Sequence, residues 1–204
     1  MDPAAAERGP RAAALRPRAG RHRVNLPNLI TLGRLLAVPL AVWLILDDRM
    51  LQAFLLFVLA GISDAIDGFI AKNYDQRTQL GALLDPLADK ALLVSVYVTL
   101  GVAHYLPTWL VILVVFRDVL IIGGYLFIKL LDQPFRAQPL IISKINTGLQ
   151  IALVALLLGQ VGLGFGAHGL VTVLIWAVAA TTVLSGTAYL IRCGRVLAGM
   201  EQEL

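Results

Sequence analysis

The sequence predicts an all-α, polytopic integral membrane protein with six transmembrane helices and both termini in the cytoplasm. Hydrophobic residues make up 58% of its 204 positions, and the mean hydropathy is +0.80. Several apolar runs approach the roughly 20 residues that an α-helix needs to cross a bilayer. Most basic residues outside these runs lie on one side of the predicted membrane, and this asymmetry sets the orientation.

The first predicted helix, 26–46, begins next to Pro27, a residue that suits the first turn of a helix. Its early turns carry Asn28, Thr31 and Arg34 at three-residue intervals. This polar stripe could cap the helix and neutralise an aspartate elsewhere. Alternatively, if it faced the acidic residues of the next helices, it would hold the oxygens of a nucleotide or diphosphate.

The second and third predicted helices, 50–73 and 78–103, carry acidic residues close to the turn that joins them. The fourth, 107–131, has Arg117 and Asp118 in mid-span. Adjacent side chains project from a helix in different directions, so these two need not pair with each other. A buried guanidinium can bind phosphate bidentately, which makes Arg117 a candidate phosphate ligand.

The fifth predicted helix, 142–160, opens with the polar residues Lys144, Asn146, Thr147 and Gln150. Lys144 is a second candidate for phosphate binding, because its ammonium is a compact point charge. The sixth helix, 168–192, follows a segment that we expect to form a flexible outer turn, with glycines at 159, 162, 164, 166 and 169.

Basic residues gather before the first helix, in the second and fourth connections and after the sixth helix: Arg8, Arg11, Arg16, Arg18, Arg21, Arg23, Lys72, Arg77, Lys129, Arg136, Arg192 and Arg195. The opposite loops offer only Arg49. The positive-inside rule therefore places both termini in the cytoplasm. We expect 1–24 to be a disordered, lipid-attracted tail without nucleic-acid binding, 25–195 the membrane domain, and 196–204 a short second tail.

The bacterial inner (cytoplasmic) membrane is the expected location, with the mitochondrial inner membrane as the alternative. The Arg-rich start resembles a mitochondrial presequence, but it lacks serine and a clear amphipathic stripe. Cys193 is the only cysteine, which excludes an intramolecular disulfide and a cysteine-based metal site.

Four aspartates stand at fixed spacing in the pattern D-x2-D-G-x2-A-K-x8-G-x3-D-x3-D: Asp64, Asp67, Asp85 and Asp89. A carboxylate costs roughly 2.5–3.5 kcal/mol at the centre of a membrane helix, so four require compensation, and bound metal supplies it best. Helical periodicity puts each pair on one face, so two helix ends can point their carboxylates at one another. Oxygen ligands suit Mg²⁺ or Mn²⁺, and two such ions about 3.5–4 Å apart form a clamp for phosphoryl displacement.

Three small residues, Gly68, Ala71 and Gly81, lie among the carboxylates. Their small size lets a helix or a ligand approach the backbone closely. Lys90 follows Asp89 and turns off its face, so we expect it in an inter-helical ion pair. Intramembrane aspartates also serve ion and proton transporters. These carboxylates cluster at the cytoplasmic face without an internal repeat, which favours an enzyme.

The pattern from Asp64 to Asp89 resembles the signature of the CDP-alcohol phosphotransferases, six-helix membrane enzymes that commonly form homodimers. The resemblance implies that Asp64, Asp67 and Asp85 ligate one metal, and that Asp89 joins a second metal and acts as the base. It also implies a CDP pocket formed by Asn28, Thr31, Asp67, Gly68, Ala71, Lys72 and Gly81. Lys72 departs from the usual arginine: the charge is kept, but the bidentate fork is lost.

Three further segments are similar to CMP-forming cardiolipin synthases: LPNLITLGRLLAVP (26–39), FRDVLII (116–122) and ISKINTGLQIALVA (142–155). The related phosphatidylglycerophosphate synthases often have a second lysine where this chain has Asn146. A second lysine suits the dianionic monoester of glycerol 3-phosphate, whereas asparagine fits the monoanionic diester of phosphatidylglycerol. The expected reaction is therefore phosphatidyl transfer from CDP-diacylglycerol to phosphatidylglycerol, giving cardiolipin and CMP, with glycerol 3-phosphate as the alternative acceptor.

Overall fold

The computed structural model describes the backbone of residues 26–74, 79–130 and 141–197, and the side chains of residues 33–64, 90–124 and 141–195. All regular secondary structure in these ranges is α-helical, which confirms the predicted all-α class. The helices are α1 (Leu26–Leu46), α2 (Met50–Tyr74), α3 (Gln79–Val102), α4 (Thr108–Leu130), α5 (Ile141–Leu163) and α6 (His168–Leu197). All six helices that the sequence predicts are therefore present.

The two C-terminal helices are longer than the sequence predicts. α6 continues past the predicted end at residue 192 to Leu197. Basic residues can remain in a helix at the membrane boundary, because their long side chains extend the charged group into water. α5 runs through Gly159 and Gly162, which were expected in a flexible turn. A Cβ at Gly162 would lie 2.7 Å from the Leu51 backbone, so glycine here lets α5 pass directly against α2.

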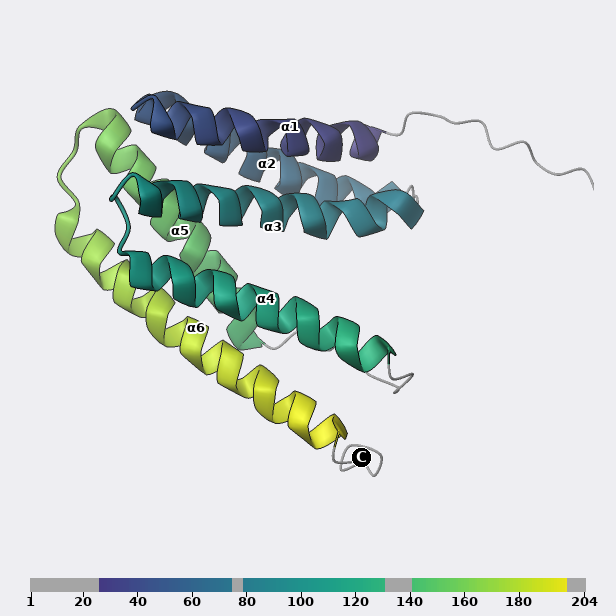
Figure 1. Cartoon of the computed structure of the whole chain (residues 1–204). Coiled ribbons are helices and arrows are strands. Elements are labelled where there is room, and N and C mark those ends of the chain that lie inside the picture. The colour runs from purple at the N-terminus through teal and green to yellow at the C-terminus, as the bar shows by residue number, and fades with distance from the viewer. Residues whose placement is uncertain (1–25, 75–78, 131–140, 198–204) are drawn as a thin grey trace, which may run out of the picture.

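The helices alternate in direction, so that the chain has two distinct ends (Figure 1). The turn end holds the three short connections, at residues 47–49, 103–107 and 164–167. The opposite end, here called the site end, holds the last turns of α2 and the first turns of α3 (Figure 1). The aspartates of the pattern lie in these turns. α1 packs against α2 and α3, α5 packs against α2 and α6, and α4 contacts α3 and α6.

The buried core is apolar and is formed by side chains from all six helices, among them Ile45, Ala53, Tyr97, Leu110, Leu153 and Val178. The outer surface is apolar as well, because large side chains such as Leu36, Phe116 and Trp176 are about two-thirds exposed (64–65%). Exposed apolar surface of this extent is unfavourable in water and suits a lipid environment.

Within the described residues, two helices are long and apolar enough to cross a bilayer: Ile141–Leu163 and His168–Arg195. The same residues include shorter apolar stretches of three other helices: Gly33–Leu46, Met50–Asp64 and Lys90–Val102. The structure thus supports two membrane-span candidates, and crossing by all six helices remains a prediction.

Two turns at the turn end are closed in the same way. Asp48 (φ 56°) and His104 (φ 61°) adopt left-handed conformations, and paired backbone hydrogen bonds of the Schellman type end the preceding helices. The Tyr105 hydroxyl donates a hydrogen bond to Asp48 Oδ1 at 3.3 Å, which joins the two turns. Burial and the adjacent Asp48 carboxylate raise the pKa of Tyr105.

Candidate active site

A cavity of about 480 Å³ lies beside the start of the aspartate pattern. The described residues that line it come from α1, α2, α3 and α5. The polar ones are Arg34, Asp64, Lys90 and Thr147, and the others are apolar or glycine. A concave apolar site with a few converging polar groups is the usual form of a pocket for an amphipathic ligand.

Asp64 is the one aspartate of the pattern whose side chain lies in the described part of the chain. Its Oδ1 is 3.0 Å from Nη2 of Arg34, with the Asp64 side chain 52% exposed and the Arg34 side chain 4% exposed. The interpretation that the stripe on the first helix neutralises an aspartate is confirmed for Arg34. The exposed carboxylate on the cavity wall is the kind of oxygen donor that hard cations bind.

The backbone alone places the remaining residues of the predicted metal and nucleotide site. Asn28 and Thr31 lie in α1, four residues lie in the last turns of α2 (Asp67, Gly68, Ala71 and Lys72), and three lie in the first turns of α3 (Gly81, Asp85 and Asp89). Their side chains lie outside the described ones, so their roles stay predictions. Their helices bring them to the site end (Figure 1).

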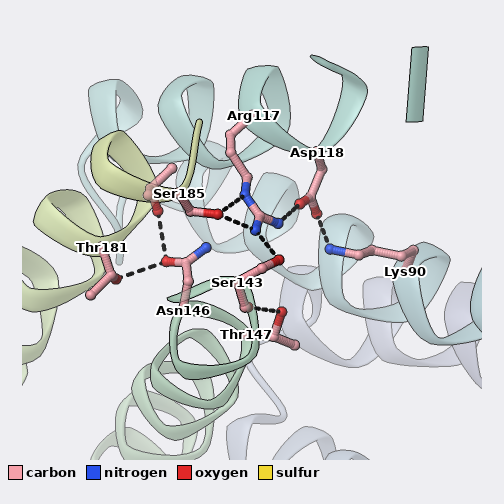
Figure 2. Close-up of polar contacts among 9 residues, drawn as sticks. Lys90, Arg117, Asp118, Ser143, Asn146, Thr147, Thr181 and Ser185 are labelled. Atoms are coloured by element: carbon pink, nitrogen blue, oxygen red, sulfur yellow. Dashed lines mark hydrogen bonds and ion pairs between the residues drawn. The ribbon is translucent and has the colours of Figure 1, made fainter. Parts of the chain in front are cut away.

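A polar network beside the cavity is centred on Arg117 of α4 (Figure 2). Its Nη1 donates to Asp118 Oδ1 at 2.8 Å. Nε and Nη2 donate to Ser185 Oγ at 3.2 and 2.6 Å, and Nη2 also donates to Ser143 Oγ. The sequence left open whether Arg117 and Asp118 pair, and the structure shows that they do, because the long arginine side chain brings its guanidinium to the neighbouring carboxylate.

Lys90 forms the inter-helical ion pair that the sequence predicts. Its Nζ lies 2.7 Å from Asp118 Oδ2 and joins α3 to α4 (Figure 2). The Lys90 side chain is 31% exposed and lines the cavity, whereas those of Arg117 and Asp118 are 4% exposed. Sequence reasoning did not identify Lys90 as a cavity residue, although its position directly after Asp89 was a usable signal.

The predicted phosphate ligands differ in their surroundings. Arg117 is held by internal partners and is not among the described residues of the cavity wall. A phosphate would have to displace one of these partners to reach its guanidinium. Lys144 is exposed and has no ion pair with any side chain that the structure describes. Phosphate binding by either residue remains a prediction.

Asn146, which suggested the acceptor, faces α6. It is fully buried (0% exposed), and its Oδ1 accepts hydrogen bonds from the hydroxyls of Thr181 and Thr182, both at 2.9 Å (Figure 2). Its neighbour Thr147 lines the cavity instead. The two threonines had no distinguishing spacing in the sequence, so their contact with α5 was not predictable.

A family model described as CDP-alcohol phosphatidyltransferase matches residues 24–184. The chain is 38% identical over 189 residues to CDP-diacylglycerol–glycerol-3-phosphate 3-phosphatidyltransferase 1, chloroplastic, of Oryza sativa subsp. japonica, which covers 83% of this chain and 57% of that protein. It is 33% identical over 182 residues to the CMP-forming cardiolipin synthase of Homo sapiens, covering 81% of this chain and 60% of that protein.

The chain thus spans little more than half the length of these two relatives. A third similar protein is the CDP-diacylglycerol–glycerol-3-phosphate 3-phosphatidyltransferase of Rickettsia typhi, which is 33% identical over 174 residues. That match covers 83% of this chain and 97% of the rickettsial protein.

Proposed function

This chain belongs to the CDP-alcohol phosphatidyltransferase family, and from that membership we propose that it transfers the phosphatidyl group of CDP-diacylglycerol to phosphatidylglycerol. The products are cardiolipin and CMP. The observation that carries the proposal is Asp64, the first residue of the aspartate pattern, on the wall of a largely apolar cavity. Such a cavity offers a charged contact and an apolar wall to the same lipid molecule.

The proposed metal site consists of the carboxylates of Asp64, Asp67, Asp85 and Asp89, which would hold a pair of Mg²⁺ or Mn²⁺ ions. Bound metal would supply charge neutralisation at the diphosphate and at the departing CMP. The oxygen donors of these side chains match the preference of both cations. Arg34, which holds Asp64 at 3.0 Å, fixes the orientation of that carboxylate from α1.

The proposed reaction is a displacement at the phosphorus that carries diacylglycerol. The acceptor hydroxyl oxygen forms the new phosphoester bond, the phosphoanhydride bond breaks, and CMP leaves with the bonding electrons. Asp89 would take the proton of the acceptor hydroxyl. The CDP pocket would be formed by Asn28, Thr31, Asp67, Gly68, Ala71, Lys72 and Gly81. Lys144 would bind the acceptor phosphate, and Arg117 would do so only by exchanging a serine partner for the phosphate.

Glycerol 3-phosphate is the alternative acceptor, and two observations favour it. The rickettsial relative, named for that acceptor, matches over 97% of its own length. The side chain of Asn146 contacts α6, so its influence on the choice of acceptor is indirect. The apolar cavity wall suits CDP-diacylglycerol, the lipid donor of both reactions, and so does not decide between the acceptors. Phosphatidylglycerol stays the first proposal because Asn146 stands where phosphatidylglycerophosphate synthases often have a second lysine.

The test is an assay of the purified full-length chain in mixed micelles with CDP-diacylglycerol and Mg²⁺ or Mn²⁺. Phosphatidylglycerol and glycerol 3-phosphate are offered separately, and the lipid product is identified by mass. We expect cardiolipin and CMP with phosphatidylglycerol, and no turnover after a chelator removes the metal. Phosphatidylglycerophosphate as the sole product would establish the alternative acceptor, and absence of CMP with both acceptors would overturn the proposed reaction.

A further inference from the structure

We propose that Lys90 binds the phosphodiester group of a phospholipid acceptor in the cavity, and that Asp118 and Arg117 hold its ammonium in position. The inference rests on the proposed function in one respect, because it calls the lipid an acceptor. The binding site itself follows from the contacts, burial and charges of the described residues.

The first step is the position of the Lys90 ammonium. Its Nζ lies 2.7 Å from Asp118 Oδ2, and the side chain is 31% exposed on the cavity wall. A lysine ammonium has three N–H donors. Asp118 uses one of them, so the others can bind a ligand in the cavity without breaking the ion pair.

The second step is the charge of the cluster. Asp118 is shared by two cations, Lys90 and Arg117, so the three groups together carry one excess positive charge. Arg117 and Asp118 are buried at 4% exposure, and Lys90 alone of the three lines the cavity. Arg34 and Asp64 form an ion pair in the same wall. Among the described side chains of the wall no further carboxylate balances the excess charge, and a monoanion at Lys90 would do so.

The third step is the chemical class of the anion. The remainder of the described wall is largely apolar, with Phe57, Ile62, Leu92 and Ile151 among its side chains. A free phosphate or glycerol 3-phosphate gains nothing from such a wall, whereas a phospholipid can bury acyl or glycerol carbons there. CDP-diacylglycerol carries a diphosphate, whose larger charge suits a metal site. A monoanionic phosphodiester lipid therefore fits both the charge and the wall.

Native mass spectrometry of the full-length protein in detergent tests the inference without turnover. The probes are phosphatidylglycerol, CDP-diacylglycerol, glycerol 3-phosphate, and a diacylglycerol with the same chains as an uncharged reference. We expect Lys90→Met to weaken phosphatidylglycerol binding about tenfold or more, the scale of a hydrogen bond to a charged group, and Lys90→Arg to retain most of it. Arg49→Met, which removes an exposed cation at the turn end, should bind like wild type.

Wild-type affinity of Lys90→Met for phosphatidylglycerol would overturn the inference, and so would a larger loss for CDP-diacylglycerol or glycerol 3-phosphate. If that variant does not fold, the rate of amine acylation at Lys90 in the wild-type protein tests the inference. Phosphatidylglycerol should slow this acylation and diacylglycerol should not. Equal acylation rates with the two lipids would contradict the inference. If no acceptor supports CMP release while phosphatidylglycerol binding depends on Lys90, the proposed function fails and the binding site stands.

Discussion

Asp118 is the residue on which the polar network depends. It is 4% exposed and accepts from Lys90 on one oxygen and from Arg117 on the other. Each cation would be left with less compensation if this carboxylate lost its charge. Breaking a buried ion pair by removing one partner costs about 3–5 kcal/mol, far more than breaking an exposed pair.

We therefore predict that Asp118→Asn lowers the free energy of unfolding by about 3 kcal/mol. Asp47→Asn is the matched control, because it removes the same charge from an exposed pair with Arg49, with the two side chains 45% and 51% exposed. The control should cost less than about 1 kcal/mol. Unfolding of both variants in detergent, followed by circular dichroism, measures the difference, and equal losses would show that the Asp118 cluster stabilises the protein no more than an exposed ion pair does.

A second prediction at this scale concerns Asp89, the proposed base. Asp89→Asn should lower kcat by about 10²-fold or more, the usual contribution of a positioned acid or base. The measurement is CMP release in micelles, together with Mn²⁺ binding followed by electron paramagnetic resonance. A variant that folds, binds the metal and keeps wild-type turnover would remove Asp89 from this role.

At the scale of elements, α5 connects the site to the rest of the bundle. Asn146 binds two threonines of α6, Thr147 lines the cavity, and the Tyr97 hydroxyl of α3 donates to the backbone oxygen of Gln150 at 3.3 Å. Near its other end, Gly162 lies against the first residues of α2. A change in the distance between α5 and α2 would therefore also shift the cavity wall.

Gly162→Ala should destabilise the protein by about 1–3 kcal/mol, the usual cost of overpacking. The added Cβ would lie 2.7 Å from backbone atoms of Leu51, which cannot rotate away as a side chain could. Gly148→Ala is the control in the same helix, because its Cβ would meet nothing within 4 Å. The control should be neutral or up to about 1 kcal/mol more stable, since alanine favours a helix. Thermal unfolding of both variants in detergent decides, and equal midpoints would contradict the close approach.

For the whole molecule, the two ends of the bundle differ in chemistry. The turn end carries aromatic contacts: Trp109 and Trp176 rings lie 5.5 Å apart, and the Arg49 guanidinium lies 5.1 Å above the Trp43 ring. Tryptophans of this kind are typical of a membrane interface. The site end carries the aspartates, and Arg195 lies in the last turn of α6. That the site end faces the cytoplasm remains the prediction of the positive-inside rule.

The predicted orientation can be measured by thiol labelling in a Cys193→Ser background. Arg49→Cys and Gly166→Cys lie in connections at the turn end, and Arg195→Cys lies at the opposite end of α6. We expect a membrane-impermeant maleimide to label the first two in intact cells and Arg195→Cys only after permeabilisation. Labelling of Arg195→Cys in intact cells, or of Arg49→Cys and Gly166→Cys from opposite sides, would contradict the topology.

The sequence by itself determined the helical class, the order of the six helices and the aspartate pattern that indicates the family. Apolar runs, helical periodicity and the spacing of Asp64 through Asp89 are local properties of the chain, so they can be predicted without knowing its neighbours. The ion pair of Lys90 was also predictable as a type of contact, because a lysine amid apolar residues needs a partner.

Only the tertiary structure decided which partners those residues have. It paired Lys90 with Asp118, brought Arg117 to Ser185, and turned Asn146 toward α6. These contacts join residues 28 to 68 positions apart in the chain. They depend on which helices pack together and on how each helix is rotated about its axis. A local sequence pattern does not predict the rotation of a helix about its axis, because this rotation results from the packing of all the helices together.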